Sequence, residues 1–506
     1  MFTKILIANR SEIASRIIAT CAEMGIATVA VFTPADTDAP FVRAADEAVA
    51  LPDDASYLDI DAIVDAATLT GASAVHPGYG FLSENGEFAA AVEARGITFI
   101  GPQSDTIATM GAKVEALELM SRVGIPVLAS AVVPDGADVA PIGNDVGFPL
   151  LVKASSGGGG KGMRVVHDPA ALADAVESAR REAHASFGDP SVFLERFVEQ
   201  ARHIEVQIFG DHHGNVIHIY DRECSVQRRF QKVVEEAPAP FIADATRHGL
   251  WDAAVTAAGA VGYVGAGTVE FILEPDGRFS FLEMNTRLQV EHTVTEETTG
   301  LDLVRMQIEV ADGGRLPPQT AVPPVVGHAL EARVYAEKPK AGYAPSTGVI
   351  ERFRVPAGVR VDAGVENGSR VTHHFDPMIA KVIATAPTRH EAARVLGMAL
   401  ARSEIHGVST NRDLLVHALG DTGFLTGPID TNWLDRLVPK VGDRDAAAMR
   451  ASATAAVLAI AQSNRAEARV QASIPSGWRN IRSAPAKITL SSDDGPIEAT
   501  YTIGTG

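Results

Sequence analysis

The chain has 506 residues, of which 46% are hydrophobic and 21% are charged, and its formal net charge is −19. The length implies several domains, the composition excludes general disorder, and the acidic balance argues against nucleic acid or an anionic membrane as the main partner. Two cysteines, Cys21 and Cys224, exclude a disulfide framework and a cysteine-based zinc site. The N-terminal run MFTKILIANR lacks the features of a signal peptide, and no apolar run reaches the ~18 residues of a membrane span. We therefore expect a cytoplasmic protein.

Residues 1 to 110 alternate between strand-like and helix-like runs. The strand-like run KILIA is followed by a predicted helix from about Ser11 to Met24, then by ATVAVF, and the pattern continues to ITFIG. Such alternation predicts a parallel sheet covered by helices. The GxGxxG fingerprint of dinucleotide binding is missing after the first strand. The loop HPGYGFLSEN at 76 to 85 follows a strand, where open α/β sheets place ligands, although a simple turn is the alternative.

A glycine run interrupts the next part of the chain. After a predicted helix from about Asp105 to Arg122, which carries Lys113, the segment FPLLVKASSGGGGKGMRVV places four glycines between two β-prone runs. This arrangement predicts a hairpin whose backbone N–H groups could close over phosphates, with Lys153 and Lys161 adding charge. It is not a Walker loop, because Gly162 and a strand stand where Ser or Thr and a helix are needed. Glycine-rich loops are weak evidence by themselves.

The middle of the chain contains a cluster of cations. The segment RECSVQRRFQKVVEEAP at 222 to 238 holds Arg222, Arg228, Arg229 and Lys232, and such a run is usually a solvated face. Arg333, in contrast, lies in the strand-like run GHALEARVYAE among apolar residues. A buried guanidinium without a partner is costly, so Arg333 needs an anionic partner or a ligand.

The stretch from 265 to 292 holds the most informative pattern. Two β-prone runs, TVEFILE and RFSFLEM, flank Asp276-Gly277, which predicts a hairpin with a two-residue turn. This register places Glu270 directly opposite Glu283, and like charges in such a pair are destabilising. A hard divalent cation would resolve the conflict, and Asn285 shares a face with Glu283. The alternative is an exposed hairpin end with solvated carboxylates.

The same alternation continues with Arg287, Gln289 and Glu291. In one extended strand Glu291 would lie ~26 Å from Glu283, too far to share a ligand. We therefore expect a bend or a strand end between Asn285 and Glu291, which separates a metal and phosphate subsite from an anion subsite. In the anion subsite Arg287 could clamp a small oxyanion and Glu291 could remove its proton. A surface ion pair is the alternative reading.

Taken in order, these motifs resemble those of biotin carboxylase, a member of the ATP-grasp superfamily. The resemblance runs from KILIANR to DTNWLDRL near 437, through HPGYGFLSEN, MGAKVEA, KASSGGGGKGMRVV, EMNTRLQVEH, GHALEARVYAE and FDPMIAKV. It is strongest to the biotin carboxylase region of bacterial acyl-CoA carboxylase α-subunits of the methylcrotonyl, propionyl or acetyl type.

The resemblance implies an α/β fold with three domains and an extension. A Rossmann-like parallel-sheet domain would occupy residues 1–112, and an ATP-grasp domain would occupy residues 113–317, with a mobile lid at about 131–203. A C-terminal α+β biotin carboxylase domain would occupy residues 325–438. Residues 439–506 read as an Ala-rich helical linker followed by the start of a β-rich domain, which we expect to be cut short.

The resemblance also implies a role for each motif residue. ATP would be held by Lys113, Lys153, Gly159, Gly160, Glu195, Arg196, Phe197, Val198 and His203. Two magnesium or manganese ions would be held by Glu270, Glu283 and Asn285. Bicarbonate would be held by Lys232, Arg287, Gln289, Val290 and Glu291, with Glu291 as the base. Arg333 would stabilise the biotin enolate, and Tyr79 would lie near the biotin ring.

The implied activity is the ATP- and bicarbonate-dependent carboxylation of biotin at N1′ through carboxyphosphate, a ligase reaction and the first half-reaction of an acyl-CoA carboxylase. The biotin acceptor, a lysine between two methionines, is not in the sequence, so biotin would be carried on a carrier domain elsewhere. Further implied partners are a carboxyltransferase β-subunit and a second copy of the chain in a homodimer or larger assembly. A catalytically silent scaffold and another ATP-grasp ligase are the alternatives.

Four positions depart from the usual family pattern. Ser11 replaces a glycine, Thr293 replaces a proline, and Gly342-Tyr343-Ala344 replaces a more apolar run. Phe230 stands where a histidine near the nucleotide is common. We expect Phe230 to weaken ATP binding without removing the chemistry.

Overall fold

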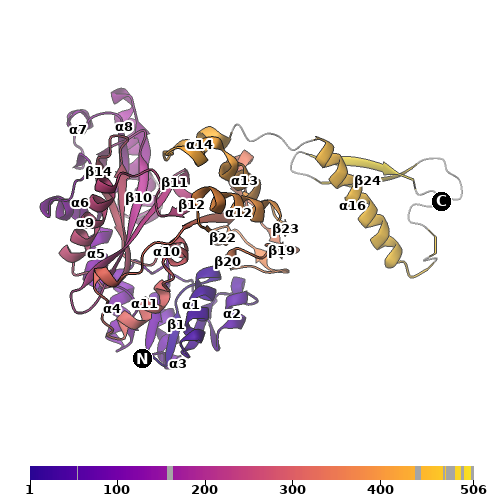
Figure 1. Cartoon of the computed structure of the whole chain (residues 1–506), viewed down its shortest axis with the longest axis horizontal. Helices are drawn as coiled ribbons and strands as arrows, with labels where there is room; N and C mark the ends of the chain where they lie inside the picture. The colour runs from indigo at the N-terminus through magenta and orange to yellow at the C-terminus, as the bar shows by residue number, and fades with distance from the viewer. Residues whose placement is uncertain are drawn as a thin grey trace. The chain divides into compact units, whose positions relative to one another are not determined.

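A computed structural model describes residues 1–53, 55–155, 163–438, 446–470, 473–474, 485–491 and 495–502. The chain forms two compact units, residues 1–438 and residues 439–506 (Figure 1). In the described ranges, no helix combines the length and the apolar character needed to cross a bilayer. The predicted phosphate-binding residues Gly159 and Gly160 lie outside the described residues.

The first unit begins with a five-stranded parallel sheet of order β3-β2-β1-β4-β5, which confirms the predicted alternation (Figure 1). Its strands are β1 Lys4–Ile7, β2 Ala27–Phe32, β3 Glu47–Ala50, β4 Ala74–His76 and β5 Thr98–Phe99. Its helices are α1 Ser11–Glu23, α2 Pro40–Ala44, α3 Ile60–Thr70 and α4 Gly86–Ala94. The loop at 76–85 follows β4 and therefore lies at the carboxyl edge of the sheet, as predicted.

The predicted single helix at 105 to 122 is wrong, because two helices occupy this range. Helix α5 spans Ser104–Gly111 and helix α6 spans Lys113–Arg122. Ala112 between them is extended, with φ −83° and ψ 93°, and the preceding Gly111 has low helix propensity. Lys113 therefore becomes the first residue of a helix instead of a residue in the middle of one.

The glycine run joins two strands of a four-stranded sheet of order β6-β9-β7-β8. Its strands are β6 Ser130–Val132, β7 Leu150–Ala154, β8 Arg164–Val166 and β9 Val192–Arg196, and its helices are α7 Val139–Val146 and α8 Leu172–Phe187. Strands β7 and β8 pair in antiparallel fashion with Leu150 opposite Val166, which confirms the predicted hairpin. The tip of that hairpin lies outside the described residues.

An eight-stranded sheet of order β14-β13-β10-β11-β12-β15-β22-β20 is the centre of the first unit. Its strands are β10 Arg202–Gly210, β11 Val216–Arg228, β12 Gln231–Ala237, β13 Gly265–Leu273, β14 Phe279–Asn285, β15 His328–Tyr335, β20 Arg360–Ala363 and β22 Met378–Ala386. The accompanying helices are α9 Asp244–Ala260, α10 His292–Thr299, α11 Leu303–Ala311, α12 Arg389–Ala401, α13 Arg412–Gly420, α14 Thr422–Thr426 and α15 Trp433–Leu437. Apolar residues of β10, β13 and α9, among them Val206, Phe271 and Leu250, form one of its cores.

Short elements complete the first unit. Three small antiparallel pairs join β16 Glu337–Lys338 to β17 Ala344–Pro345, β18 Gly348–Val349 to β21 Arg370–Val371, and β19 Arg352–Arg354 to β23 Glu404–His406. Single 3-10 turns occupy Pro34–Asp36, Pro169–Ala171, Gln319–Ala321 and Pro339–Ala341.

The β13–β14 hairpin places Glu270 directly opposite Glu283, as predicted, but its turn differs from the prediction. The backbone N–H of Glu274 donates to the carbonyl of Arg278 at 2.8 Å, so the loop has three residues rather than two. A two-residue turn would pair Pro275 with Arg278, and proline has no N–H to give. The strand pairs near the turn are consequently offset by one residue, and a bulge next to Glu270 restores the predicted register.

The second unit contains the predicted Ala-rich helix and β-prone tail. Helix α16 spans Ala446–Ala466, and β24 Ala486–Leu490 pairs in antiparallel fashion with β25 Ile497–Tyr501.

Candidate active site

Strand β14 ends at Asn285, and helix α10 begins at His292, so the predicted strand end between Asn285 and Glu291 is confirmed. The intervening segment 286–291 is anchored to the loop after β4. The backbone N–H of Thr286 donates to Glu84 at 3.1 Å, and Nε of Arg287 lies 2.7 Å from the other oxygen of Glu84. The chain therefore turns back over the sheet rather than continuing along it.

Charged side chains cross one face of the eight-stranded sheet, because direct cross-strand partners share a face. One set of partners on β14, β13, β10 and β11 is Glu283, Glu270, Glu205 and Arg222. The other set on β12, β15, β22 and β20 is Glu235 opposite Glu331, followed by Arg333, Lys381 and Asp362. We call these nine residues the charged stripe. Lys232 and Glu291 lie against its middle.

Lys232 joins the first set of the charged stripe to Glu291, which in turn pairs with Arg333 of the second set. Its ammonium nitrogen lies 2.6 Å from Glu205, 2.8 Å from Glu270 and 2.6 Å from Glu291. Burial alone would lower the pKa of Lys232, but these three carboxylates raise it well above its usual value. The ammonium therefore stays charged in the interior.

The expected solvated face at 222 to 238 is wrong for most of its cations. Arg222 is fully buried and is paired with Glu205, and Arg228 is paired with the buried Glu337. The sequence did not reveal the burial of these arginines, because both faces of the second half of β11 are covered and polar and apolar residues therefore do not alternate there.

The carboxylates of the hairpin differ from each other in their contacts. Glu270 accepts hydrogen bonds from Lys232, from Asn285 at 2.9 Å and from Gln289 at 3.0 Å, and Nε2 of His203 lies 2.8 Å from its other oxygen. Burial raises the pKa of Glu270, but Lys232 and His203 outweigh it and hold this pKa well below its usual range. Glu283 has no hydrogen-bond or ion-pair partner among the described residues. Burial and the charge of Glu270 raise its pKa.

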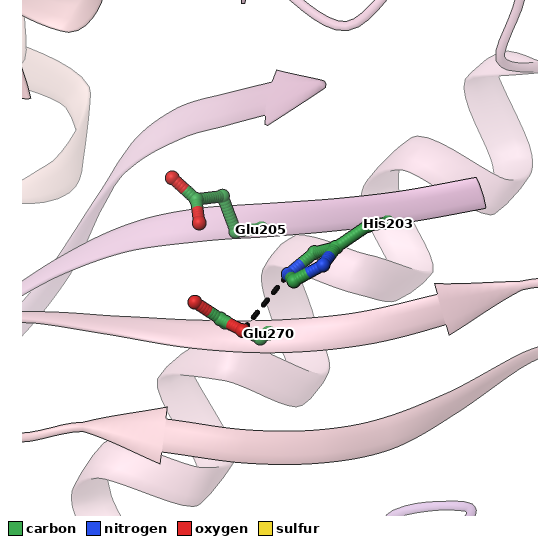
Figure 2. A group of neighbouring side chains, drawn as sticks. All are labelled: His203, Glu205 and Glu270. Carbon is green, nitrogen blue, oxygen red and sulfur yellow. Dashed lines mark ion pairs between the residues drawn. The ribbon is translucent and has the colours of Figure 1, made fainter. Parts of the chain in front are cut away.

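The residues present fit a hard divalent cation. Two facing carboxylates and the side-chain amide of Asn285 supply oxygen ligands, and Glu283 lacks a compensating charge of its own. A second cluster, His203, Glu205 and Glu270, also brings ligand atoms within 4.8 Å of one another (Figure 2). There, however, Arg222 pairs with Glu205 and Lys232 pairs with Glu205 and Glu270, so this cluster is satisfied without an ion.

The anion subsite is lined by guanidinium groups. Arg333 pairs with Glu291 at 2.9 Å and with Glu235 at 2.5 Å, which confirms that it has anionic partners. Arg287 donates to Asn285 at 2.9 Å and to Gln289 at 3.0 Å. Glu291 is fully buried, and despite that burial Lys232, Arg333 and Arg222 lower its pKa well below its usual range. Glu291 is therefore an ionised carboxylate between cations.

A cavity of about 1080 Å³ covers both subsites. The sequence-predicted residues on its wall are Tyr79, Lys113, Lys153, Glu195, Arg196, Phe197, Val198, His203, Lys232, Glu270, Glu283, Asn285, Arg287, Gln289, Val290 and Arg333. Glu291 is not on the wall, but it contacts Lys232 and Arg333, which are. Within the wall Lys153 pairs with Glu195, and burial lowers the pKa of Lys113.

Three of the departures from the family pattern have visible consequences. Ser11 has φ +62°, a left-handed conformation that favours the glycine usual at this position. Thr293 donates its hydroxyl to the buried Glu331, a bond that proline could not make. Phe230 also has a left-handed φ of +66°, and its ring lines the cavity with 42% of its surface exposed. Phe230 therefore offers no side-chain hydrogen bond to a nucleotide in the cavity.

Sequence reasoning missed the residues that compensate the site: Glu205, Arg222, Glu235, Glu331 and Lys381. Each is buried in a strand, and Glu205, Glu331 and Lys381 stand between apolar neighbours, so the available signal at those three was a charged residue inside a β-prone run. That signal was used for Arg333 only. It applied equally to Glu205 in HIEVQIF and to Lys381 in MIAKVIA.

Three family models match the chain in sequence order. The model "Biotin carboxylase, N-terminal domain" matches residues 1–107, "Carbamoyl-phosphate synthase L chain, ATP binding domain" matches residues 112–319, and "Biotin carboxylase C-terminal domain" matches residues 331–436. Biotin carboxylase 2 of Bacillus subtilis is 47% identical over 441 residues, which cover 86% of this chain and 99% of that protein. The chain belongs to the biotin carboxylase family. The resemblance seen in the motifs is therefore confirmed.

Longer relatives contain the same biotin carboxylase region. The α-subunit of methylcrotonoyl-CoA carboxylase from rice (Oryza sativa subsp. japonica) is 49% identical over 445 residues, which cover 86% of this chain and 60% of that subunit. The chain therefore spans about 60% of the length of such α-subunits.

Solved biotin carboxylase structures have the same fold. The biotin carboxylase domain dimer of Hydrogenobacter thermophilus 2-oxoglutarate carboxylase, in complex with MgADP, ADP and bicarbonate, has a TM-score of 0.85 and 43% identity, with 88% of this chain and 99% of that chain covered. Biotin carboxylase of Campylobacter jejuni in a β-γ-ATP complex has a TM-score of 0.84 and 40% identity, with 86% and 99% covered. The predicted α/β fold with an ATP-grasp domain is confirmed.

Proposed function

We propose that this chain carboxylates biotin at N1′ with ATP and bicarbonate, as the first half-reaction of an acyl-CoA carboxylase. The observation that carries the proposal is the pairing of two subsites in one cavity. A facing carboxylate pair, Glu270 and Glu283, of which Glu283 has no ion-pair partner among the described residues, lies beside an ionised carboxylate, Glu291, that is held between Lys232 and Arg333. The bound ADP, magnesium and bicarbonate of the Hydrogenobacter structure are the ligands that such a cavity would require.

Glu270, Glu283 and Asn285 would hold magnesium or manganese, which when bound neutralises charge on the phosphates of ATP. Lys113 and Lys153 line the same cavity and would contact the phosphate chain. The segment Glu195–Val198, together with His203, would contact the rest of the nucleotide, because these residues form another part of the wall.

In the proposed reaction, bicarbonate binds among Lys232, Arg287 and Gln289, with the backbone of Val290 beside it. Glu291 removes the proton of bicarbonate, the resulting oxyanion forms a bond to the γ-phosphorus, and the bond from that phosphorus to ADP breaks. Lys232 and Arg333 hold the pKa of Glu291 low in the free site. The basicity of Glu291 rises when the ammonium group of Lys232 turns toward the substrate anion, since Lys232 then stabilises the carboxylate less.

The second step forms the product. Carboxyphosphate breaks into carbon dioxide and phosphate, the phosphate accepts the N1′ proton of biotin, and N1′ forms the new bond to carbon dioxide. Negative charge develops on the ureido oxygen of biotin, and Arg333 is a fixed guanidinium that can stabilise it. Tyr79 lies on the same cavity wall, where the biotin ring would pack.

The proposal includes the setting of the reaction. Biotin would arrive on a carrier domain, and a carboxyltransferase β-subunit would use the product, because the relatives include α-subunits of acyl-CoA carboxylases. The chain would act as a homodimer or in a larger carboxylase assembly. A cytoplasmic location is consistent with two buried free cysteines, Cys21 and Cys224.

The test is ATP cleavage by the purified chain with magnesium, bicarbonate and free biotin. We expect cleavage that depends on bicarbonate and increases with biotin, together with acid-labile incorporation of radiolabelled bicarbonate into biotin. The Glu291→Gln variant sets the background. Wild-type rates equal to that background would favour the scaffold alternative, whereas bicarbonate-dependent cleavage without biotin carboxylation would favour another ATP-grasp ligase.

A further inference from the structure

Lys381 is a fully buried lysine that the proposed reaction does not use. It lies on β22, directly opposite Arg333 on β15 and Asp362 on β20, and none of its side-chain surface is exposed. Removing an ammonium group from water is costly unless it is well paired. The nearest carboxylate oxygen that pairs with Lys381, on Asp362, is 3.7 Å away, which is longer than a hydrogen bond. Ion pairing alone therefore does not account for its position.

The direct hydrogen bond of Lys381 goes to the bicarbonate segment. Its ammonium nitrogen donates to the main-chain carbonyl of Val290 at 2.8 Å. Val290 precedes Glu291, and the segment 286–291 has no strand pairing of its own after β14 ends. The bond to Lys381 therefore fixes the backbone at the point from which the side chain of Glu291 emerges.

The same ammonium lies near the predicted biotin subsite. It is 5.8 Å from the centre of the Tyr79 ring, within the range of a cation–π contact. The loop that carries Tyr79 is anchored on its other side, because Asn9 donates to the carbonyls of Pro77 at 2.7 Å and Tyr79 at 2.8 Å. Lys381 therefore contacts both the segment that would hold bicarbonate and the ring that would pack against biotin.

We propose that Lys381 is a positioning residue that sets the distance between the bicarbonate and biotin subsites. The proposal rests on the proposed function. Carbon dioxide released beside Glu291 must meet N1′ of biotin beside Tyr79, and small misplacements of reacting groups lower such rates steeply. Lys381 consequently determines what fraction of ATP cleavage ends in carboxylated biotin.

The experiment measures carboxylated biotin formed for each ATP cleaved, in the wild type and in Lys381→Met. Methionine keeps the length and loses the donor and the charge. We expect this ratio to fall at least fivefold and the KM for bicarbonate to rise, while the KM for ATP stays within twofold. Lys381→Arg, which keeps a charged donor, should give a ratio between those of the wild type and Lys381→Met. Lys4→Met, at a surface pair remote from the site, is the matched control and should leave the ratio unchanged.

An unchanged ratio in Lys381→Met, with a lower melting temperature, would overturn the proposal and show that Lys381 acts only in packing. Should the methionine variant fail to fold, Lys381→Leu removes the donor and the charge with a shorter apolar side chain, and a ratio equal to that of the wild type would overturn the proposal equally. Failure of the proposed function is distinguishable, because the wild type itself would then form no carboxylated biotin.

Discussion

The two ends of the charged stripe are built in opposite ways. On β13 and β14, Glu270 faces Glu283, and Glu283 has no compensating partner in the described part of the chain. Further along the sheet, Glu205 of β10 and Glu235 of β12, with the adjoining Glu291, each contact Lys232 or Arg333. The first end therefore leaves one carboxylate without an ion pair and is suited to a cation, whereas the other presents cations and is suited to an anion. The difference shows that the pairing of each carboxylate, rather than its residue type, decides whether it is free to bind a cation.

The largest expected effect comes from breaking the compensated end. Arg222 is fully buried and donates to Glu205, to Gln207 at 2.7 Å and to Thr268 at 3.1 Å. Arg222→Met leaves a buried carboxylate without one of its cations, so we expect the free energy of unfolding to fall by ~3–5 kcal/mol. Chemical denaturation measures the change.

The control for that variant is Arg278→Met. Arg278 forms ion pairs only at the surface, with its side chain 73% exposed, so its removal should leave stability nearly unchanged. Equal losses of stability in Arg222→Met and Arg278→Met would mean that a buried ion pair of the charged stripe matters no more than an exposed one.

The next effect tests the uncompensated end. In Glu283→Gln we expect the apparent affinity for magnesium in ATP cleavage to fall about tenfold or more, because an anionic oxygen ligand is replaced by a neutral one. Without metal the same variant should be at least as stable as the wild type, because a like-charge repulsion is removed. A magnesium titration of ATP cleavage measures the affinity, and thermal unfolding without magnesium measures the stability.

Glu270→Gln is the comparison for Glu283→Gln. It removes the carboxylate charge that pairs with Lys232 and lies beside His203, so it should lower stability even without metal. If Glu283→Gln destabilised the metal-free protein as much as Glu270→Gln, the assignment of the two ends would fail.

A smaller effect depends on pH. Burial raises the pKa of Glu331 to about 7, although Lys381 and Arg333 oppose the shift. Because the folded pKa lies above the unfolded one, the folded state binds more protons between about pH 4.5 and 7, and this group's contribution to stability falls as pH rises through that window. Relative to the wild type, Glu331→Gln should remove a decline of roughly 1 kcal/mol per pH unit. An identical pH dependence in both proteins would contradict this.

The smallest effect concerns the nucleotide side of the cavity. Phe230→His restores a polar side chain at a position that lines the cavity, so we expect the KM for ATP to fall several-fold with little change in kcat. Steady-state kinetics measures both constants. Phe230→Leu is the matched control, since it remains apolar and should not lower the KM. An unchanged KM in Phe230→His would show that this departure does not affect ATP binding.

Much of the fold was predictable, because its patterns are local. The alternation in residues 1 to 110 predicted a parallel sheet, and the hairpin pattern predicted the pairing of Glu270 with Glu283. The turn was wrong because Pro275 overrides the Asp-Gly preference, and the predicted register survived through a bulge. The helix break at Ala112 was missed because one extended residue carries little signal in a helical pattern.

The candidate site was only half predictable from the residues. Register and spacing predicted the facing carboxylates Glu270 and Glu283 and the strand end after Asn285. The family resemblance added the remaining roles. The partners of Lys232 and Arg333 come from β10, β12 and β13, which are distant in sequence. Sequence spacing carries no information about such long-range pairs, so Glu205 and Glu235 could not be assigned before the strand order was known.

The fate of the bicarbonate oxygens tests the central claim most directly. With bicarbonate labelled in all three oxygens by a heavy isotope, the proposed attack on the γ-phosphorus transfers one labelled oxygen to each phosphate formed and leaves two in carboxylated biotin. Mass spectrometry of phosphate and product from the wild-type chain reads both. Singly labelled phosphate in step with carboxylation is the predicted result, and unlabelled phosphate beside fully labelled product would contradict the account.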